Sequence, residues 1–176
     1  LKGLRVARWQ PGLALYPSSV IKLAVLVEAA LRDASGDLAA TGGLVAPAQF
    51  VSTNPVLTRQ DVDAALDLVV AGDHAAANGL IDRLGMERIN GSMADLGLTN
   101  TVLSRRFNAP VPSHTPANQM TAVDAARLMY RLARRDLPQG QAADRVRASL
   151  GRNPHNDMLS RDLMGLPGVR TLHLGG

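Results

Sequence analysis

The stretch Tyr16-Pro17-Ser18-Ser19-Val20-Ile21-Lys22-Leu23 begins an apolar segment that continues to Ala30. From Val20 to Val27 every residue except Lys22 is aliphatic, so the sequence predicts a helix that is buried on all sides. Two residues that favour a helix start precede Ser19, which places Ser19 in the first helical turn. We expect the rest of the domain to be organised around this helix.

Lys22 is the one charged residue between Val20 and Val27. A buried ammonium group is costly unless it is paired, hydrogen-bonded or neutralised by a lowered pKa. Of the 19 Lys and Arg residues, only Lys2 and Lys22 are lysines. Because arginine keeps its proton in proteins and lysine can release it, we interpret Lys22 as a chemical choice.

Ser19 and Lys22 are three residues apart, so their side chains project from the same face of the predicted helix. The first turn of a helix also offers free backbone N–H groups and a dipole that favour an oxyanion. The spacing therefore indicates an activated serine nucleophile with an amine base. The alternative for the same pattern is a serine that caps the helix and a lysine that extends to the surface.

The composition predicts one soluble domain over residues 1–176, long enough to bury a core. Hydrophobic residues make up 46% and charged residues 19%, and no apolar run reaches the ~20 residues of a membrane span. The sequence shows no signal peptide. The absence of Cys excludes disulfides and thiolate metal sites.

The net charge of +4 and the pI near 10.3 raise the question of a nucleic-acid partner. The arginines are spread over every predicted helix, and an aromatic content of 3% leaves few rings to stack on bases. We therefore expect no nucleic-acid partner. The four His residues lack metal-binding spacing and there is no phosphate-binding glycine loop, so we expect no metal or other cofactor.

The order of expected elements is a strand, a large helical middle and a second strand, which predicts an α+β fold. The first strand is expected at residues 4–9 and is followed by a turn at 10–12. The Ser19 helix is expected to end near residues 33–36, and residues 37–57 are expected to form a long loop. Further helices are expected at 58–71, 74–84, 86–96, 121–135, 141–150 and 155–164, and the last strand at 169–174. Asp73 is expected to cap the helix at 74–84.

With these elements in order, the sequence resembles the penicillin-recognising serine enzymes, and within them the class A β-lactamase-like group. The resemblance extends over nearly all of the chain from Tyr16 onward. It implies a β-lactamase/transpeptidase-like fold, in which strands of an antiparallel sheet flank a helical middle; the sheet would be incomplete in this chain, which we expect to be truncated after Gly176. The landmarks are Ser19-Val20-Ile21-Lys22, residues 68–85 with Gly72-Asp73-His74, residues 96–101, residues 115–122, and Leu166-Pro167-Gly168 before a strand.

The resemblance implies that Ser19 attacks the carbonyl of a β-lactam, a D-alanyl peptide or an ester to form an acyl-enzyme. Lys22 would be the general base, and the Ser19 backbone N–H would supply half of the oxyanion hole. A small-molecule or peptidoglycan-like substrate and a secreted or periplasmic location are also implied, whereas the oligomeric state is left open. The expected substrate-binding residues are Gly72, Asp73, His74, Gly175 and Gly176.

Three positions depart from the pattern of the family. Gly72-Asp73-His74 stands where the family has Ser-Asp-Asn, so the hydroxyl that passes a proton to the leaving group is missing. Phe107 and Asn108 stand where the family has the carboxylate that activates water for deacylation, and no Asp or Glu occurs between Asp95 and Asp124. Leu174-Gly175-Gly176 replaces Lys-Thr-Gly, which removes the cation that attracts the substrate carboxylate.

These departures leave two main hypotheses for the function. The first is a serine hydrolase that forms an acyl-enzyme on Ser19 with Lys22 as base. The second is a β-lactamase-fold domain that has lost turnover and serves in binding or as a scaffold. A helical DNA-binding protein, with residues 62–97 as a helix-turn-helix bundle, is a third alternative that the low aromatic content and Lys22 disfavour.

Overall fold

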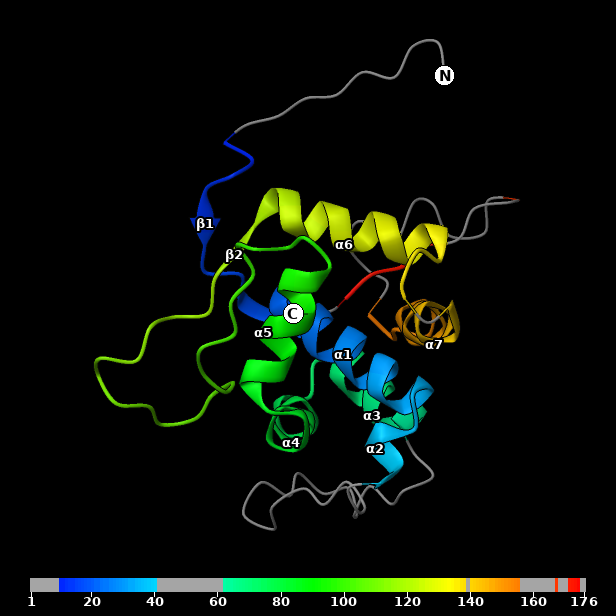
Figure 1. Ribbon diagram of the computed structural model, residues 1–176, viewed down its shortest axis with the longest axis horizontal. Helices are drawn as coiled ribbons and strands as arrows, with labels where there is room; N and C mark the ends of the chain where they lie inside the picture. The colour runs from blue at the N-terminus through cyan, green and yellow to red at the C-terminus, as the bar shows by residue number, and fades with distance from the viewer. Residues whose placement is uncertain (1–9, 41–61, 139, 156–166, 168–170, 175–176) are drawn as a thin grey trace.

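The computed structural model describes residues 10–40, 62–138, 140–155, 167 and 171–174 (Figure 1). This part of the chain is mostly helical and contains a small antiparallel sheet, which confirms the expected α+β class with an incomplete sheet. None of its helices is long and apolar enough to cross a membrane. The helices are α1 (Lys22–Ala34), α2 (Asp37–Ala40), α3 (Val62–Val70), α4 (His74–Leu84), α5 (Met86–Asp95), α6 (Ala122–Arg134) and α7 (Gly140–Gly151).

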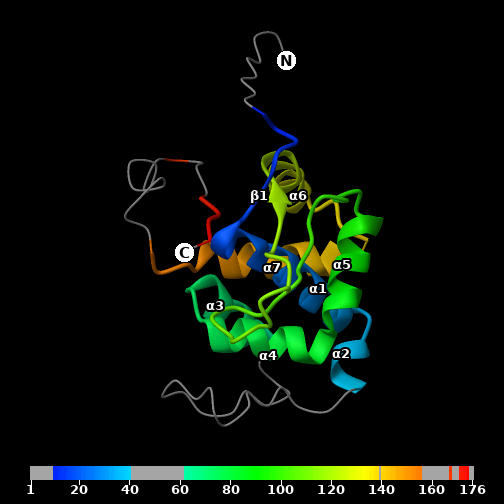
Figure 2. The same ribbon diagram turned by 90° about the vertical axis from the view of Figure 1, so that its left-hand side faces the viewer.

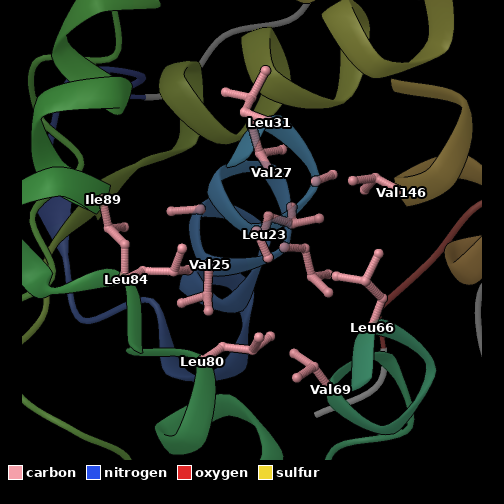
Figure 3. Packing of buried hydrophobic residues seen from close by; sticks show 14 of the residues in the cluster. Leu23, Val25, Val27, Leu31, Leu66, Val69, Leu80, Leu84, Ile89 and Val146 are labelled. Carbon is pink, nitrogen blue, oxygen red and sulfur yellow. The ribbon is translucent and has the colours of Figure 1, made fainter. Parts of the chain in front are cut away.

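Helix α1 lies at the centre of the molecule, and α3, α4, α5 and α7 all pack against it (Figures 1 and 2). Its first ten residues, Lys22 to Leu31, are all buried. Figure 3 shows apolar side chains of α1 facing a shell that comes from the surrounding helices. The predicted buried helix is therefore confirmed from Ile21 onward, but its start differs. Ser19 and Val20 lie in a 3-10 turn before α1, and Val20 is 43% exposed. The labelled shell residues are Leu66 and Val69 of α3, Leu80 and Leu84 of α4, Ile89 of α5 and Val146 of α7.

A tight junction joins α3 to α4. Gly72 follows α3 with a φ of +101°, and its N–H donates to Val69 O while the Asp73 N–H donates to Leu68 O. This pair of bonds is the Schellman arrangement that ends many helices at a glycine. The Asp73 side chain then accepts a hydrogen bond from Ala76 N at 3.0 Å and caps α4, as the sequence predicted.

The described sheet has two strands, β1 (Ala14–Leu15) and β2 (Met120–Thr121), which pair antiparallel. An isolated bridge between Val102 and Gln119 continues the contact beside them. The pairing holds the segment that leads into Ser19 against the start of α6. Both strands were missed by the sequence analysis, since two-residue strands are too short to show an alternating pattern.

Some expectations differ from the structure or lie outside it. Residues 37–40 form helix α2, whereas a loop was expected from residue 37. The predicted strand at 169–174 is wrong for residues 171–174, which have no described strand beside them to pair with. The predicted strand at 4–9, the rest of the expected loop up to residue 57 and nearly all of the helix at 155–164 lie outside the described residues.

The packing around α1 predicts a large effect of truncating Leu26, whose side chain is 0% exposed. We expect Leu26→Ala to lower the free energy of unfolding by about 2–5 kcal/mol, because it removes buried methyl groups and leaves a cavity. Leu13→Ala is the control: Leu13 is 48% exposed, and its truncation should change stability by no more than about 0.5 kcal/mol. Urea unfolding of the two variants measures the difference, and equal small effects would show that α1 is not the centre of the core.

Candidate active site

Ser19 lies in a 3-10 turn, η1 (Ser18–Ile21), that leads directly into α1. The residue before it, Ser18, has a φ of +48°, a conformation that is uncommon for a residue other than glycine. Strain of this kind is concentrated at functional sites, where the surrounding structure holds it in place. Within the described residues, the backbone N–H of half-buried Ser19 donates to no acceptor, so it is free to meet a ligand.

Lys22 is 0% exposed, which confirms the burial that the sequence predicted. Its Nζ donates a hydrogen bond to the carbonyl oxygen of Gly72 at 2.9 Å. Burial lowers the pKa of the Lys22 amine, and the nearby negative charge of Asp73 opposes this effect. This lowering makes it easier for the amine to lose its proton and become neutral, the form in which lysine accepts a proton.

The structure places Ser19 and Lys22 one turn apart, but it does not show a hydrogen bond between their side chains. Within the described part of the chain, Lys22 Nζ bonds to Gly72 O and the Ser19 hydroxyl has no hydrogen-bond partner. The transfer of a proton from the hydroxyl to the amine therefore stays a prediction.

Phe107 closes the other side of the Lys22 amine. Its ring centroid lies 5.4 Å from Lys22 Nζ, and the residue is only 7% exposed. The backbone of Phe107 is held by Asn78 of α4: the Asn78 amide donates to Phe107 O, and Asn78 Oδ1 accepts from Phe107 N, both at 2.9 Å. An aromatic ring thus lies where a carboxylate would pair with the amine.

Two further asparagines fix the loop that carries Phe107. Asn90 of α5 donates to Leu103 O at 3.0 Å and accepts from Leu103 N at 2.8 Å. Asn118 accepts from the N–H groups of Ser104 and Arg105 and donates to Arg105 O at 3.1 Å. The loop is therefore anchored at three points by side chains that replace backbone pairing.

The roles of Asn78, Asn90 and Asn118 were missed by the sequence analysis. A signal was present for Asn78, because a polar amide in the middle of an apolar helical stretch needs a buried partner. Its partner lies 29 residues away along the chain, and this distance is not encoded in any local pattern.

His74, the first residue of α4, stacks on Phe107 with ring centroids 5.6 Å apart and an angle of 21° between the planes. Its Nδ1 lies 2.5 Å from Asn108 Nδ2, and an amide nitrogen donates in such a contact. The neutral ring then carries its proton on Nε2. Burial lowers the pKa of His74, the positive charge of Lys22 lowers it further, and Asp73 opposes both. His74 is therefore set up as a neutral hydrogen-bond donor.

Of the other predicted substrate-binding residues, two make contacts within the fold and two lie outside the described residues. The Gly72 carbonyl accepts from Lys22, and the Asp73 carboxylate caps α4. Gly175 and Gly176 lie outside the described residues. Leu174 is half-buried and packs against the core. No group of three or more His, Cys, Asp or Glu side chains in the described ranges is arranged to hold a metal ion.

The α+β architecture and the central helix that begins after Ser19 place the protein in the β-lactamase-like fold class. The model of the β-lactamase enzyme family matches residues 2–176, and the chain belongs to that family. No curated protein matches the chain.

Solved structures of the same fold agree with this assignment. The β-lactamase of Sphaerobacter thermophilus DSM 20745 superposes with a TM-score of 0.80 at 21% identity, over 93% of this chain and 65% of that protein. A β-lactamase of Francisella tularensis gives 0.69 at 15% identity over 85% and 61%. A single-residue mutant of PBP-A, an acyl-enzyme complex with penicillin G, gives 0.65 at 21% identity over 85% and 58%. The chain thus spans less than two thirds of the length of these three proteins.

The lowered pKa of Lys22 predicts a pH-dependent contribution to stability. In the window between the lowered folded pKa and the unfolded value of 10.5, the unfolded chain binds a proton that the folded chain does not. The free energy of unfolding of the wild type, relative to Lys22→Met, should therefore rise with pH through this window, by up to about 1.4 kcal/mol per pH unit. Urea unfolding of the wild type and of Lys22→Met at about five pH values between 6 and 10 measures this slope. If the difference in the free energy of unfolding between the two proteins does not change with pH, the amine is charged in the folded state.

Proposed function

We propose that this protein is a serine acyl-transfer enzyme that forms a covalent acyl-enzyme on Ser19, with a β-lactam, a D-alanyl peptide or an ester as acyl donor. The observation that carries the proposal is the fully buried Lys22 amine, with its lowered pKa, one helical turn after Ser19. Membership of the β-lactamase enzyme family supports the same reaction class. A peptidoglycan-like substrate would be met at a secreted or periplasmic location.

In the proposed reaction, the neutral Lys22 amine takes the proton from the Ser19 hydroxyl as Oγ attacks the carbonyl carbon of the substrate. The free N–H of Ser19 donates to the oxyanion of the tetrahedral intermediate. When the intermediate collapses, the bond to the leaving nitrogen or oxygen breaks and Lys22 returns the proton to the leaving group. Lys22 does this alone, because Gly72 has no hydroxyl to relay the proton.

The same geometry supports a slow second step. Release of the acyl group needs a water molecule that a base has activated. The loop residue beside Lys22 is Phe107, whose ring cannot act as a base. We therefore propose that the acyl-enzyme is long-lived, so that the protein binds β-lactams covalently more readily than it hydrolyses them. The PBP-A mutant captured as a penicillin G acyl-enzyme is a structural relative with such a state.

A degenerate binding or scaffold domain is the second candidate function. The engagement of Lys22 Nζ with Gly72 O, with no hydrogen bond to Ser19 in the described part of the chain, favours this candidate. Acylation separates the two, since a scaffold domain would not react at Ser19.

The first test is labelling of Ser19. We expect a fluorescent penicillin and a fluorophosphonate to form adducts on Ser19, located by mass spectrometry of the peptide that contains it. Ser19→Ala should abolish both adducts, and Lys22→Met should slow their formation by about 10²–10⁴-fold because the base is lost. The matched control is Ser35→Ala, which removes an exposed hydroxyl bonded to Arg32 O at the end of the same helix. If the wild type forms no adduct with either probe, the acyl-transfer proposal is wrong and the scaffold function remains.

A second test restores a base beside Lys22. In Phe107→Glu, the new carboxylate would lie close to the Lys22 amine on a backbone that Asn78 already holds. We expect the penicillin adduct on Ser19 to be released about 10²–10⁴-fold faster than in the wild type. Phe107→Gln is the control, because it has the same length and polarity without a base. Equal release rates in the Glu and Gln variants would show that opening the site to water, and not general base catalysis, limits deacylation.

A further inference from the structure

We propose that Arg105 recognises an acidic group of the substrate, so that the Ser19 site prefers acyl donors that carry a carboxylate. This inference rests on the proposed acyl transfer at Ser19 and adds the class of substrate. The guanidinium carbon of Arg105 lies 5.7 Å from the ring centroid of Tyr16, which stands three residues before Ser19. The sequence analysis gave neither residue a role in binding.

The charge of Arg105 is not neutralised by the residues around it. Its guanidinium makes no ion pair and no hydrogen bond with any residue that the structure describes, whereas its neighbour Arg106 is paired with Asp82. The sequence contains no Asp or Glu from residue 96 to residue 123, so the loop itself provides no counter-ion. The Tyr16 ring holds the guanidinium through its face and leaves the N–H donors at the edge free.

Arg105 is also held in position before any ligand arrives. Asn118, which is 2% exposed, accepts from Arg105 N at 2.9 Å and donates a hydrogen bond to Arg105 O. Both polar groups of the Arg105 backbone are thus bonded to one buried side chain. Asn118 holds the backbone of Arg105, and the Tyr16 ring holds the face of its guanidinium. A guanidinium held in this way can bind a carboxylate through two N–H groups and loses little conformational entropy on binding.

The location of Arg105 sets the part of the substrate that it meets. Tyr16 is 61% exposed, so the guanidinium above its ring lies at the open side of the site. Three residues span at most about 10 Å between Cα atoms, which puts Tyr16 within reach of a substrate bound at Ser19. The acidic group would lie within about three residues of the reacting carbonyl, the length of extended chain that covers this distance. Residue 174 is a half-buried Leu that offers no charge for this purpose.

The experiment compares two depsipeptide esters that differ only in Glu or Gln two residues before the scissile ester. The acylation rate of Ser19 is followed by mass spectrometry, and a neutral fluorophosphonate measures the reactivity of Ser19 independently. We expect the wild type to be acylated about tenfold faster by the Glu peptide. Arg105→Gln should remove this preference, so that the two peptides acylate Ser19 at equal rates when each rate is divided by the rate with the fluorophosphonate.

Arg134→Gln is the matched control. Arg134 makes the same kind of contact, with its guanidinium carbon 5.7 Å from the Tyr130 ring on α6, and its substitution should leave the preference for Glu intact. An Arg105→Gln variant that slows both peptides and the fluorophosphonate equally would show that Arg105 is only structural and would overturn the inference. A wild type that reacts with the fluorophosphonate but shows no Glu preference would also overturn it. A wild type that reacts with no reagent would overturn the acyl-transfer proposal and this inference together.

Discussion

The hydrogen bond from Lys22 Nζ to the Gly72 carbonyl is the interaction on which the site depends. A fully buried amine needs a polar partner, and the partner here belongs to the turn that ends α3 and begins α4. The carbonyl accepts a hydrogen bond from the amine but carries no full negative charge. It therefore does not stabilise the ammonium form as a carboxylate would, and burial lowers the pKa of Lys22. The same contact ties the central helix to the helix pair beside it. One hydrogen bond thus both joins α1 to the turn between α3 and α4 and sets the surroundings of the Lys22 amine.

The conformation of Gly72 explains why this turn differs from the Ser-Asp-Asn pattern that the chain otherwise resembles. Its φ of +101° is needed for the Schellman bonds to Leu68 and Val69, and a residue with a side chain rarely adopts this conformation. Apart from Gly72 and its two chain neighbours, no heavy atom of the described residues lies within 4 Å of the position that a Cβ would take, so a serine would be disfavoured by backbone strain and not by crowding. The missing hydroxyl is therefore coupled to the geometry of the turn, and with it to the carbonyl that holds Lys22.

The sequence predicted the parts of the structure that depend on local pattern. The apolar run after Ser19, the capping role of Asp73 and the bounds of α4 follow from side-chain periodicity and from the chemistry of helix ends. The asparagine anchors of the loop that carries Phe107, and the stacking of His74 on that ring, join residues 13 to 33 positions apart. No periodicity links such residues, because their contacts exist only after the helices have packed. The short strands β1 and β2 were missed for the same reason, since tertiary pairing and not propensity creates them.

Phe107, which stands where the family resemblance implies a carboxylate, has opposite consequences for the two halves of the proposed reaction. A carboxylate beside Lys22 would stabilise the ammonium form and raise the pKa of the amine, whereas the ring removes water and supplies no full charge. The ring face does attract a cation, but this attraction is weaker than an ion pair at the same distance. The neutral amine that acylation requires is therefore favoured by the same ring that deprives deacylation of its base. Since Asn78 holds the Phe107 backbone at both its N–H and its carbonyl, the backbone that carries the ring cannot move away without breaking two buried hydrogen bonds. In the proposed reaction, retention of the acyl group would therefore depend on the position of the loop as well as on the residue at position 107.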